Sequence, residues 1–260
     1  MAHETPIQVA EQMFAFEAVG SRKKTGAGAR QEGAKFEQLV RVWWSAVAID
    51  LIERGAEPAV FDQNGRRWAR LTAPTGKSVV LPAHTAPVVT THTHQQRWLE
   101  TNYRTESIVE AFGQPDLVAA YAPNRGPFTG ADYPKMFHGL ETEFDDTVIF
   151  ENQGVLHEKI LLEYKSAKST KKKQIDGNAH ERLSFQMMQY LEIATRYTRC
   201  SFVVVTNGAY AKYRNKYHVN FHMQADRLRN FAWFDMAHLC TPTEIDGVHV
   251  RLRDWLKVTK

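Results

Sequence analysis

The chain of 260 residues is poor in cysteine and has no long hydrophobic run. Its two cysteines, Cys200 and Cys240, lie far apart and lack the spacing of a zinc site. We therefore expect free thiols in a reducing compartment rather than a disulfide framework. No stretch approaches the roughly 20 apolar residues that a membrane span needs, and Met1 to Glu4 has no signal-peptide character. These absences predict a cytoplasmic protein without membrane contact.

The charge of the chain favours neither sign strongly. Lys and Arg number 33 against 29 Asp and Glu, which gives a net charge of +4, and hydrophobic residues make up 43% of the chain. Such values are ordinary for globular proteins and allow one large domain or two small ones. The basic excess is compatible with a nucleic-acid partner. A Walker-type phosphate loop is not supported, because its spacing and its preceding strand are both missing.

Two helices are predicted in the first part of the chain. A short amphipathic helix is expected over residues 6–19, and a long one from about Glu32 to Arg54 with Gly55 as its C-cap. The stretch between them, Ser21 to Lys35, is basic and rich in small residues. It is interpreted either as a flexible linker or as an arm that orders on a phosphate backbone.

Strand patterns occupy three regions of the sequence. Residues 58–82 predict short strands joined by turns, and Glu143 to Lys165 predicts a β-hairpin with turn residues at 151–154. Apolar residues recur at helical spacing over 183–197, and Ser201 to Val205 predicts a buried strand. Hairpin, helix and strand in this order indicate an α/β core.

Acidic residues and a lysine meet at the open end of the predicted hairpin. Residues two apart in a strand share a face, so Glu163 and Lys165 point the same way. Asp145 and Asp146 open the partner strand, and the hairpin brings one of them beside Glu163. Two close carboxylates favour a cation between them, and Mg²⁺ takes one or two carboxylates together with water and phosphate oxygen. Because a neighbouring lysine can orient the attacking water, the group predicts metal-assisted hydrolysis of a phosphodiester.

Asp146 together with the Glu-x-Lys at positions 163–165 resembles the signature of the PD-(D/E)xK nuclease superfamily, which includes type II restriction endonucleases. The chain departs from the pattern because no proline precedes the aspartate, so Asp145 remains an alternative to Asp146. The resemblance implies a restriction-endonuclease-like core, in which helices flank a mixed central sheet, with N-terminal elaborations. It also implies that Mg²⁺ is bound by Asp146 and Glu163, and that Asp146, Glu163 and Lys165 are catalytic.

A third metal ligand is suggested in the long predicted helix. The run G-x-x-F-E, from Gly33 to Glu37, is similar to the helix that carries a metal-binding glutamate in many nucleases of this class. Glu37 is therefore a candidate ligand for Mg²⁺. The alternative is that a glutamate in the first turn of a helix favours the helix dipole.

Basic and amide side chains follow Lys165 and recur after the last core strand. The candidates for DNA contact are Lys168, Lys171, Lys172, Lys173, Asn178, His180, Arg182, Gln186, Lys212, Arg214 and Lys216. Arg182 is suited to read guanine, but a phosphate contact or an ion pair would suit it as well. Gln186 and Tyr190 fit the Q-x-x-x-Y motif of lambda-exonuclease and RecB-like nucleases, although a solvent-exposed Gln beside a core Tyr gives the same pattern.

The sequence therefore predicts a single nuclease domain over residues 1–260. It would have N-terminal helices and a β elaboration over 1–130, a catalytic core over 131–210 and a closing segment over 211–260. The resemblance implies a Mg²⁺-dependent type II restriction endonuclease, a homodimer that cuts double-stranded DNA at a short specific sequence. A lambda-exonuclease or RecB-like repair or phage nuclease is the alternative, and a catalytically silent DNA-binding relative is a third hypothesis.

Overall fold

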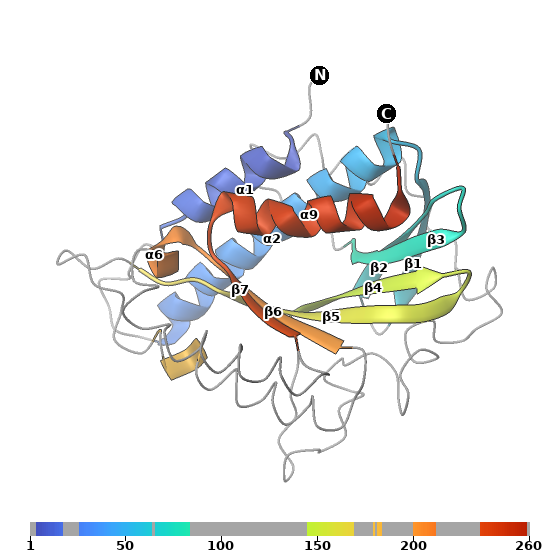
Figure 1. The fold of residues 1–260 in the computed structure, drawn as a ribbon. Helices are drawn as coiled ribbons and strands as arrows, with labels where there is room; N and C mark the ends of the chain where they lie inside the picture. The colour runs from blue at the N-terminus through green and yellow to red at the C-terminus, as the bar shows by residue number, and fades with distance from the viewer. Residues whose placement is uncertain are drawn as a thin grey trace, which may run out of the picture.

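The computed structural model describes residues 4–17, 26–63, 66–83, 145–168, 179, 181–183, 200–211 and 235–258. Their elements form a seven-stranded sheet with α2 and α9 over one face and α1 packed on both helices (Figure 1). The helices are α1 (Pro6–Ala15), α2 (Gly26–Glu53), α6 (Gly208–Ala211) and α9 (Pro242–Leu256). The strands are β1 (Glu57–Gln63), β2 (Arg66–Thr72), β3 (Lys77–Pro82), β4 (Asp146–Asn152), β5 (Val155–Lys165), β6 (Cys200–Thr206) and β7 (Asp235–Leu239).

The strands follow one another across the sheet in the order of the sequence. β1 to β5 pair antiparallel, whereas β5, β6 and β7 run parallel. The predicted α/β class is therefore confirmed, with a mixed sheet. The predicted strands over 58–82 correspond to β1 to β3, and the one over 201–205 corresponds to β6. All three predicted parts of the chain contribute strands to this one sheet.

The ends of the helices differ in part from the prediction. α2 begins at Gly26, so the linker or arm expected over Ser21 to Lys35 is instead helical from Gly26 on. Extending a helix that already exists costs little compared with nucleating one, which explains the earlier start. The predicted C-cap is confirmed, because Gly55 has φ +101° and the N–H of Ala56 donates to the carbonyl of Leu51 at 3.0 Å.

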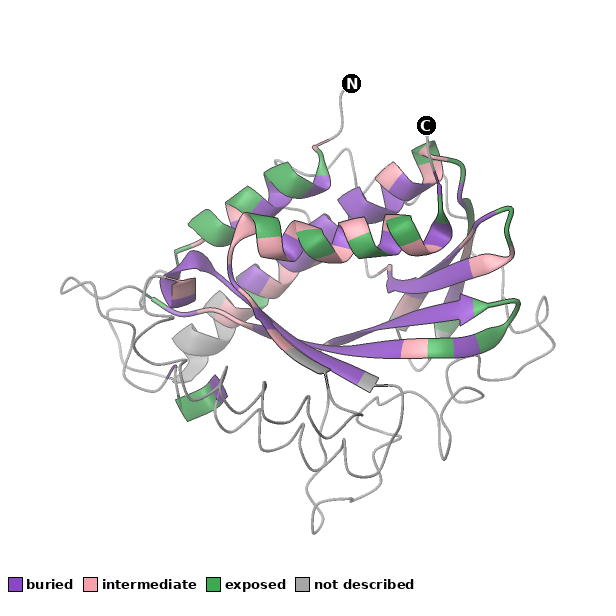
Figure 2. Ribbon diagram, in the orientation of Figure 1, coloured by how far each residue is buried: buried purple, intermediate pink, exposed green. Residues whose placement is uncertain are grey.

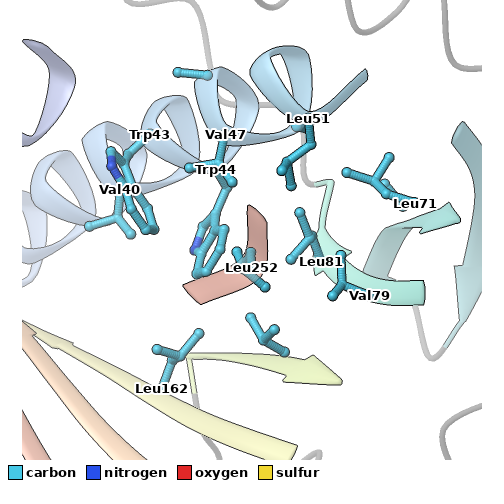
Figure 3. Packing of buried hydrophobic residues seen from close by; sticks show 14 of the residues in the cluster. Val40, Trp43, Trp44, Val47, Leu51, Leu71, Val79, Leu81, Leu162 and Leu252 are labelled. Atoms are coloured by element: carbon cyan, nitrogen blue, oxygen red, sulfur yellow. The ribbon is translucent and has the colours of Figure 1, made fainter. Parts of the chain in front are cut away.

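The core lies between the sheet and the helices that cover it. Trp44, Val47 and Leu51 of α2 point toward apolar side chains of the strands and of α9 (Figure 3). Each of the three is at most 2% exposed. Burying a large apolar side chain contributes about 1.5–3 kcal/mol, so this layer holds α2 against the sheet. In Figure 2 the middle of β4, β5 and β6 is buried, while α9 alternates between buried and exposed positions.

The β4–β5 hairpin is tighter than predicted. Its turn consists of Gln153 and Gly154, both at positive φ, a two-residue turn whose twist matches that of the strands. Asn152 pairs with Val155, but the register shifts by one residue farther from the turn. The shift leaves His157 as the extra residue of a β-bulge.

Candidate functional site

The pairing of β4 with β5 places the acids and the lysine. Asp146 lies opposite Leu162, so Asp145, immediately before β4, lies opposite Glu163. Side chains alternate between the two faces of a sheet. Asp145, Glu163 and Lys165 therefore share the face away from α2 and α9. Asp146 shares the helix-covered face with Leu162, a member of the core in Figure 3.

Asp145 lies where a negative charge is costly. Its Oδ2 accepts a hydrogen bond from the backbone N–H of Tyr164 at 2.6 Å. Burial and the charge of Glu163 raise the pKa of Asp145 to about 8, although Lys165 and the Tyr164 N–H act in the opposite direction. A carboxyl group with this pKa releases its proton at neutral pH more readily when a cation comes close.

Glu163 has one carboxylate oxygen engaged and one without a partner. Its Oε1 forms an ion pair with Nζ of Lys165. Its Oε2 is buried and has no hydrogen-bond partner in the part of the chain that the structure describes. Burial raises the pKa of Glu163, Lys165 lowers it, and the charge of Glu37 raises it further. A buried oxygen without a partner costs free energy, which a bound cation or donor would offset.

Glu37 adds a third negative charge from α2. Its charge raises the pKa of both Asp145 and Glu163, so the helix places Glu37 within electrostatic reach of the pair. The described residues contain no ready-made cluster of three or more His, Cys, Asp or Glu side chains arranged for a metal ion. The oxygen donors still suit a hard divalent cation, because Mg²⁺ binds through one or two carboxylates and keeps several waters.

Asp146, the aspartate preferred from the sequence, points to the other side of the sheet. It is 2% exposed and lies beside Tyr164, whose hydroxyl accepts a hydrogen bond from Nε1 of Trp44 at 2.8 Å. Burial and the neighbouring Asp146 raise the pKa of Tyr164 well above its usual range. The structure thus brings the alternative, Asp145, together with Glu163 and leaves Asp146 on the helix-covered face.

The bulge at His157 is the physical reason why Asp145, and not Asp146, lies opposite Glu163. A hairpin that kept the register of its turn would place Asp146 opposite Leu161, on the face of Glu163. The one-residue shift between Phe150 and Glu151 reverses that relation and puts Asp145 opposite Glu163. A change of register by one residue moves every side chain to the other face of a sheet.

Asn207, which the sequence reasoning did not single out, holds the segment that follows Lys165. Its Nδ2 donates to the carbonyl oxygens of Ala167 and Phe16, each at 2.8 Å, and its Oδ1 accepts from the N–H of Ala167 at 3.1 Å. The next residue must be small, because a Cβ at Gly208 would lie 2.4 Å from the carbonyl oxygen of Phe14. The Asn-Gly pair at the end of a buried strand was the signal available in the sequence.

The predicted DNA contacts are only partly described. Lys168 is exposed shortly after Lys165, and Arg182 is exposed on the helical residues 181–183. The other candidates lie outside the described residues and stay predictions: Lys171, Lys172, Lys173, Asn178, His180, Gln186, Tyr190, Lys212, Arg214 and Lys216.

The chain matches no protein-family model, no curated protein and no solved structure. Among the described residues, no helix has both the length and the apolar character needed to cross a membrane.

Proposed function

We propose that this chain is a metal-dependent deoxyribonuclease of the PD-(D/E)xK class, and within that class a type II restriction endonuclease. The observation that carries the proposal is the group on one face of the sheet. Asp145 lies opposite Glu163, Lys165 is paired with Glu163, and Oε2 of Glu163 is buried without a hydrogen-bond partner among the residues that the structure describes. The mixed sheet with α2 and α9 over one face is compatible with the core that the signature implies.

Each residue of the group has a role in this proposal. Asp145 and Glu163 would bind Mg²⁺, and Glu37 would add negative charge or a further ligand from α2. A bound Mg²⁺ lowers the pKa of a coordinated water and neutralises charge on the phosphate. The Lys165 side chain is 26% exposed, so its ammonium reaches the surface where the substrate would lie. There it would orient the attacking water and stabilise the charge that develops on the phosphate oxygens.

The substrate would be double-stranded DNA, cut by a homodimer with one such site in each protomer. Lys168 is exposed three residues after Lys165, and an exposed cation can replace counterions of a phosphate backbone. An enzyme of the lambda-exonuclease or RecB-like kind would instead require a DNA end, and a silent relative would bind DNA without cutting it.

A closed circular plasmid separates these functions. With Mg²⁺ we expect discrete linear fragments, and no cleavage in EDTA. Ca²⁺ should support a gel shift without cleavage, because it has looser coordination geometry and activates water less well. Full cleavage in EDTA would contradict the proposal. Degradation only after linearisation would favour the exonuclease, and binding without any cleavage would favour the silent relative.

A further inference from the structure

A buried polar group lies directly beneath the proposed site, on the other face of β5. Tyr164, the residue between Glu163 and Lys165, directs its side chain under the sheet and is 5% exposed. Its hydroxyl accepts a hydrogen bond from Nε1 of Trp44 on α2 at 2.8 Å. Asp146 lies on the same face of the hairpin, diagonal to Tyr164 across the strand pair.

The three side chains are polar in a layer that is otherwise apolar. Their neighbours in this layer include Val148 and Leu162. The three polar side chains themselves are at most 5% exposed. The Tyr164 hydroxyl accepts from Trp44 and can donate its own proton to the Asp146 carboxylate on the same face. Well-packed apolar side chains are often at least as stable at such positions, so stability alone does not account for the group.

Each member of this group is connected to one of the acids above it. Asp146 directly follows Asp145 in the chain. The backbone N–H of Tyr164 holds the Asp145 carboxylate at 2.6 Å, and Tyr164 directly follows Glu163. Trp44 lies about two helical turns after Glu37, so the two residues project from the same side of α2. Holding the buried group in place therefore holds the backbone of all three acids.

We infer that Trp44, Tyr164 and Asp146 are positioning residues, which set the spacing of the acids from α2, β4 and β5 for a divalent cation. The inference rests on the proposed function, because it assigns the acids to a cation. None of the three is assigned as a ligand, since the Trp44 and Tyr164 polar atoms bond one another and Asp146 lies beside Leu162 on the helix-covered face. Loss of the contacts that orient metal ligands typically lowers metal affinity by about 10–100-fold.

Direct binding of Mn²⁺, followed by the electron paramagnetic resonance signal of the free ion, tests the inference without an activity assay. Tyr164→Phe removes the hydroxyl and keeps the ring. Ser78→Ala is the matched control, because it removes a buried hydroxyl that bonds Glu151 at 2.8 Å, near the opposite end of β4 from Asp146. We expect Tyr164→Phe to bind Mn²⁺ about tenfold more weakly than the wild type. Ser78→Ala should bind as the wild type does, although both variants lose thermal stability.

The outcomes separate the inference from the function on which it rests. Equal Mn²⁺ affinity in Tyr164→Phe and the wild type overturns the inference and leaves the proposed function in place. Absence of Mn²⁺ binding by the wild type overturns both. If Tyr164→Phe does not fold, Trp44→Phe provides the same test with the same expectation.

The role of Asp146 has its own conservative test. Asp146→Asn keeps an acceptor for the Tyr164 hydroxyl and should bind Mn²⁺ nearly as the wild type does. Asp145→Asn should lose binding, because it removes the charge of a ligand. A loss of binding in Asp146→Asn as complete as that in Asp145→Asn would make Asp146 a ligand and overturn its assignment as a positioning residue.

Discussion

Two charged groups lie on the same face of the sheet, and they differ in how far their charges are balanced. In the first group, Arg70 of β2 donates to Oε1 of Glu151 at 2.7 Å, and Ser78 of β3 donates to Oε2 at 2.8 Å. Arg70 and Glu151 are at most 3% exposed. Both oxygens of the carboxylate have partners, and the charge of Glu151 is met directly by the Arg70 guanidinium.

The second group carries a surplus of negative charge. Among the described residues, Lys165 is the cation that lowers the pKa of both Asp145 and Glu163, and Oε2 of Glu163 has no hydrogen-bond partner there. Burial raises the pKa of both acids. A balanced buried pair has a structural role, whereas an unbalanced one costs stability until a ligand compensates it. Perturbed acids of this kind are concentrated at functional sites.

The largest expected effect comes from breaking the unbalanced group. Glu163→Gln and Lys165→Ala should each lower the rate of plasmid cleavage by roughly a thousandfold or more, as the loss of a central catalytic group does. DNA affinity in a gel shift should stay close to that of the wild type, since neither residue lies in the basic segments. Wild-type cleavage rates in either variant would contradict the assignment of the site.

Breaking the balanced group should affect stability instead. Arg70→Met leaves the charge of Glu151 buried without compensation, which costs about 3–5 kcal/mol of unfolding free energy. Urea denaturation measures the loss. Arg67→Met on the same strand is the control, because its pair with Asp62 is 35% and 55% exposed and should contribute about 1 kcal/mol or less. Similar losses of unfolding free energy in both variants would show that the buried pair contributes no more to stability than the exposed one.

The pH dependence of stability tests the unbalanced group without any assay of cleavage. The pKa of Asp145 rises from 3.8 in the unfolded chain to about 8 in the fold, so between these values the folded protein keeps a proton that the unfolded chain releases. The unfolding free energy should therefore fall as the pH rises from about 4 to 8. Melting temperatures in EDTA measure this slope. Asp145→Asn should reduce it, and added Ca²⁺ should reduce it by compensating the charge.

Asp50 is the control with the opposite sign. Burial would raise its pKa, but hydrogen bonds from His249 at 2.8 Å and Arg54 at 2.7 Å lower it to about 2. Its contribution to stability is present above pH 3.8 and is lost as the pH falls toward 2. Asp50→Asn should reduce only this fall in unfolding free energy at acid pH. The reduction should be about 1 kcal/mol, because the pairs are partly exposed. For Asp145 the contradicting outcome would be an unfolding free energy that rises between pH 4 and 8 in the wild type but not in Asp145→Asn. Such a result would mean that Asp145 does not lie beside Glu163.

Much of the fold could be predicted because its signals are local. The period of two along β5 puts Glu163 and Lys165 on one face whatever strand lies beside them. The end of α2 at Gly55 depends on hydrogen bonds among Leu51, Ile52, Gly55 and Ala56, which are close neighbours in the chain. The Arg70–Glu151 pair escaped prediction because its members are 81 positions apart and no local pattern connects them.

The choice between the two aspartates depended on a register shift that the sequence does not reveal. The turn at Gln153 and Gly154 alone would set a register in which Asp146 faces Glu163. The bulge at His157 changes that register, and the His157 ring stacks on Trp255 of α9 with 4.6 Å between ring centroids. This partner comes from the far end of the chain, so only the folded protein brings it to the hairpin.

The sequence by itself determined that an acid and a lysine share one face at the end of a buried strand, because alternation along a strand is a property of the backbone. It also determined that one of two adjacent aspartates comes beside them. Only the tertiary structure decided that this residue is Asp145, because a one-residue shift in pairing exchanges the two faces of a strand. That shift is made where the hairpin packs against α9.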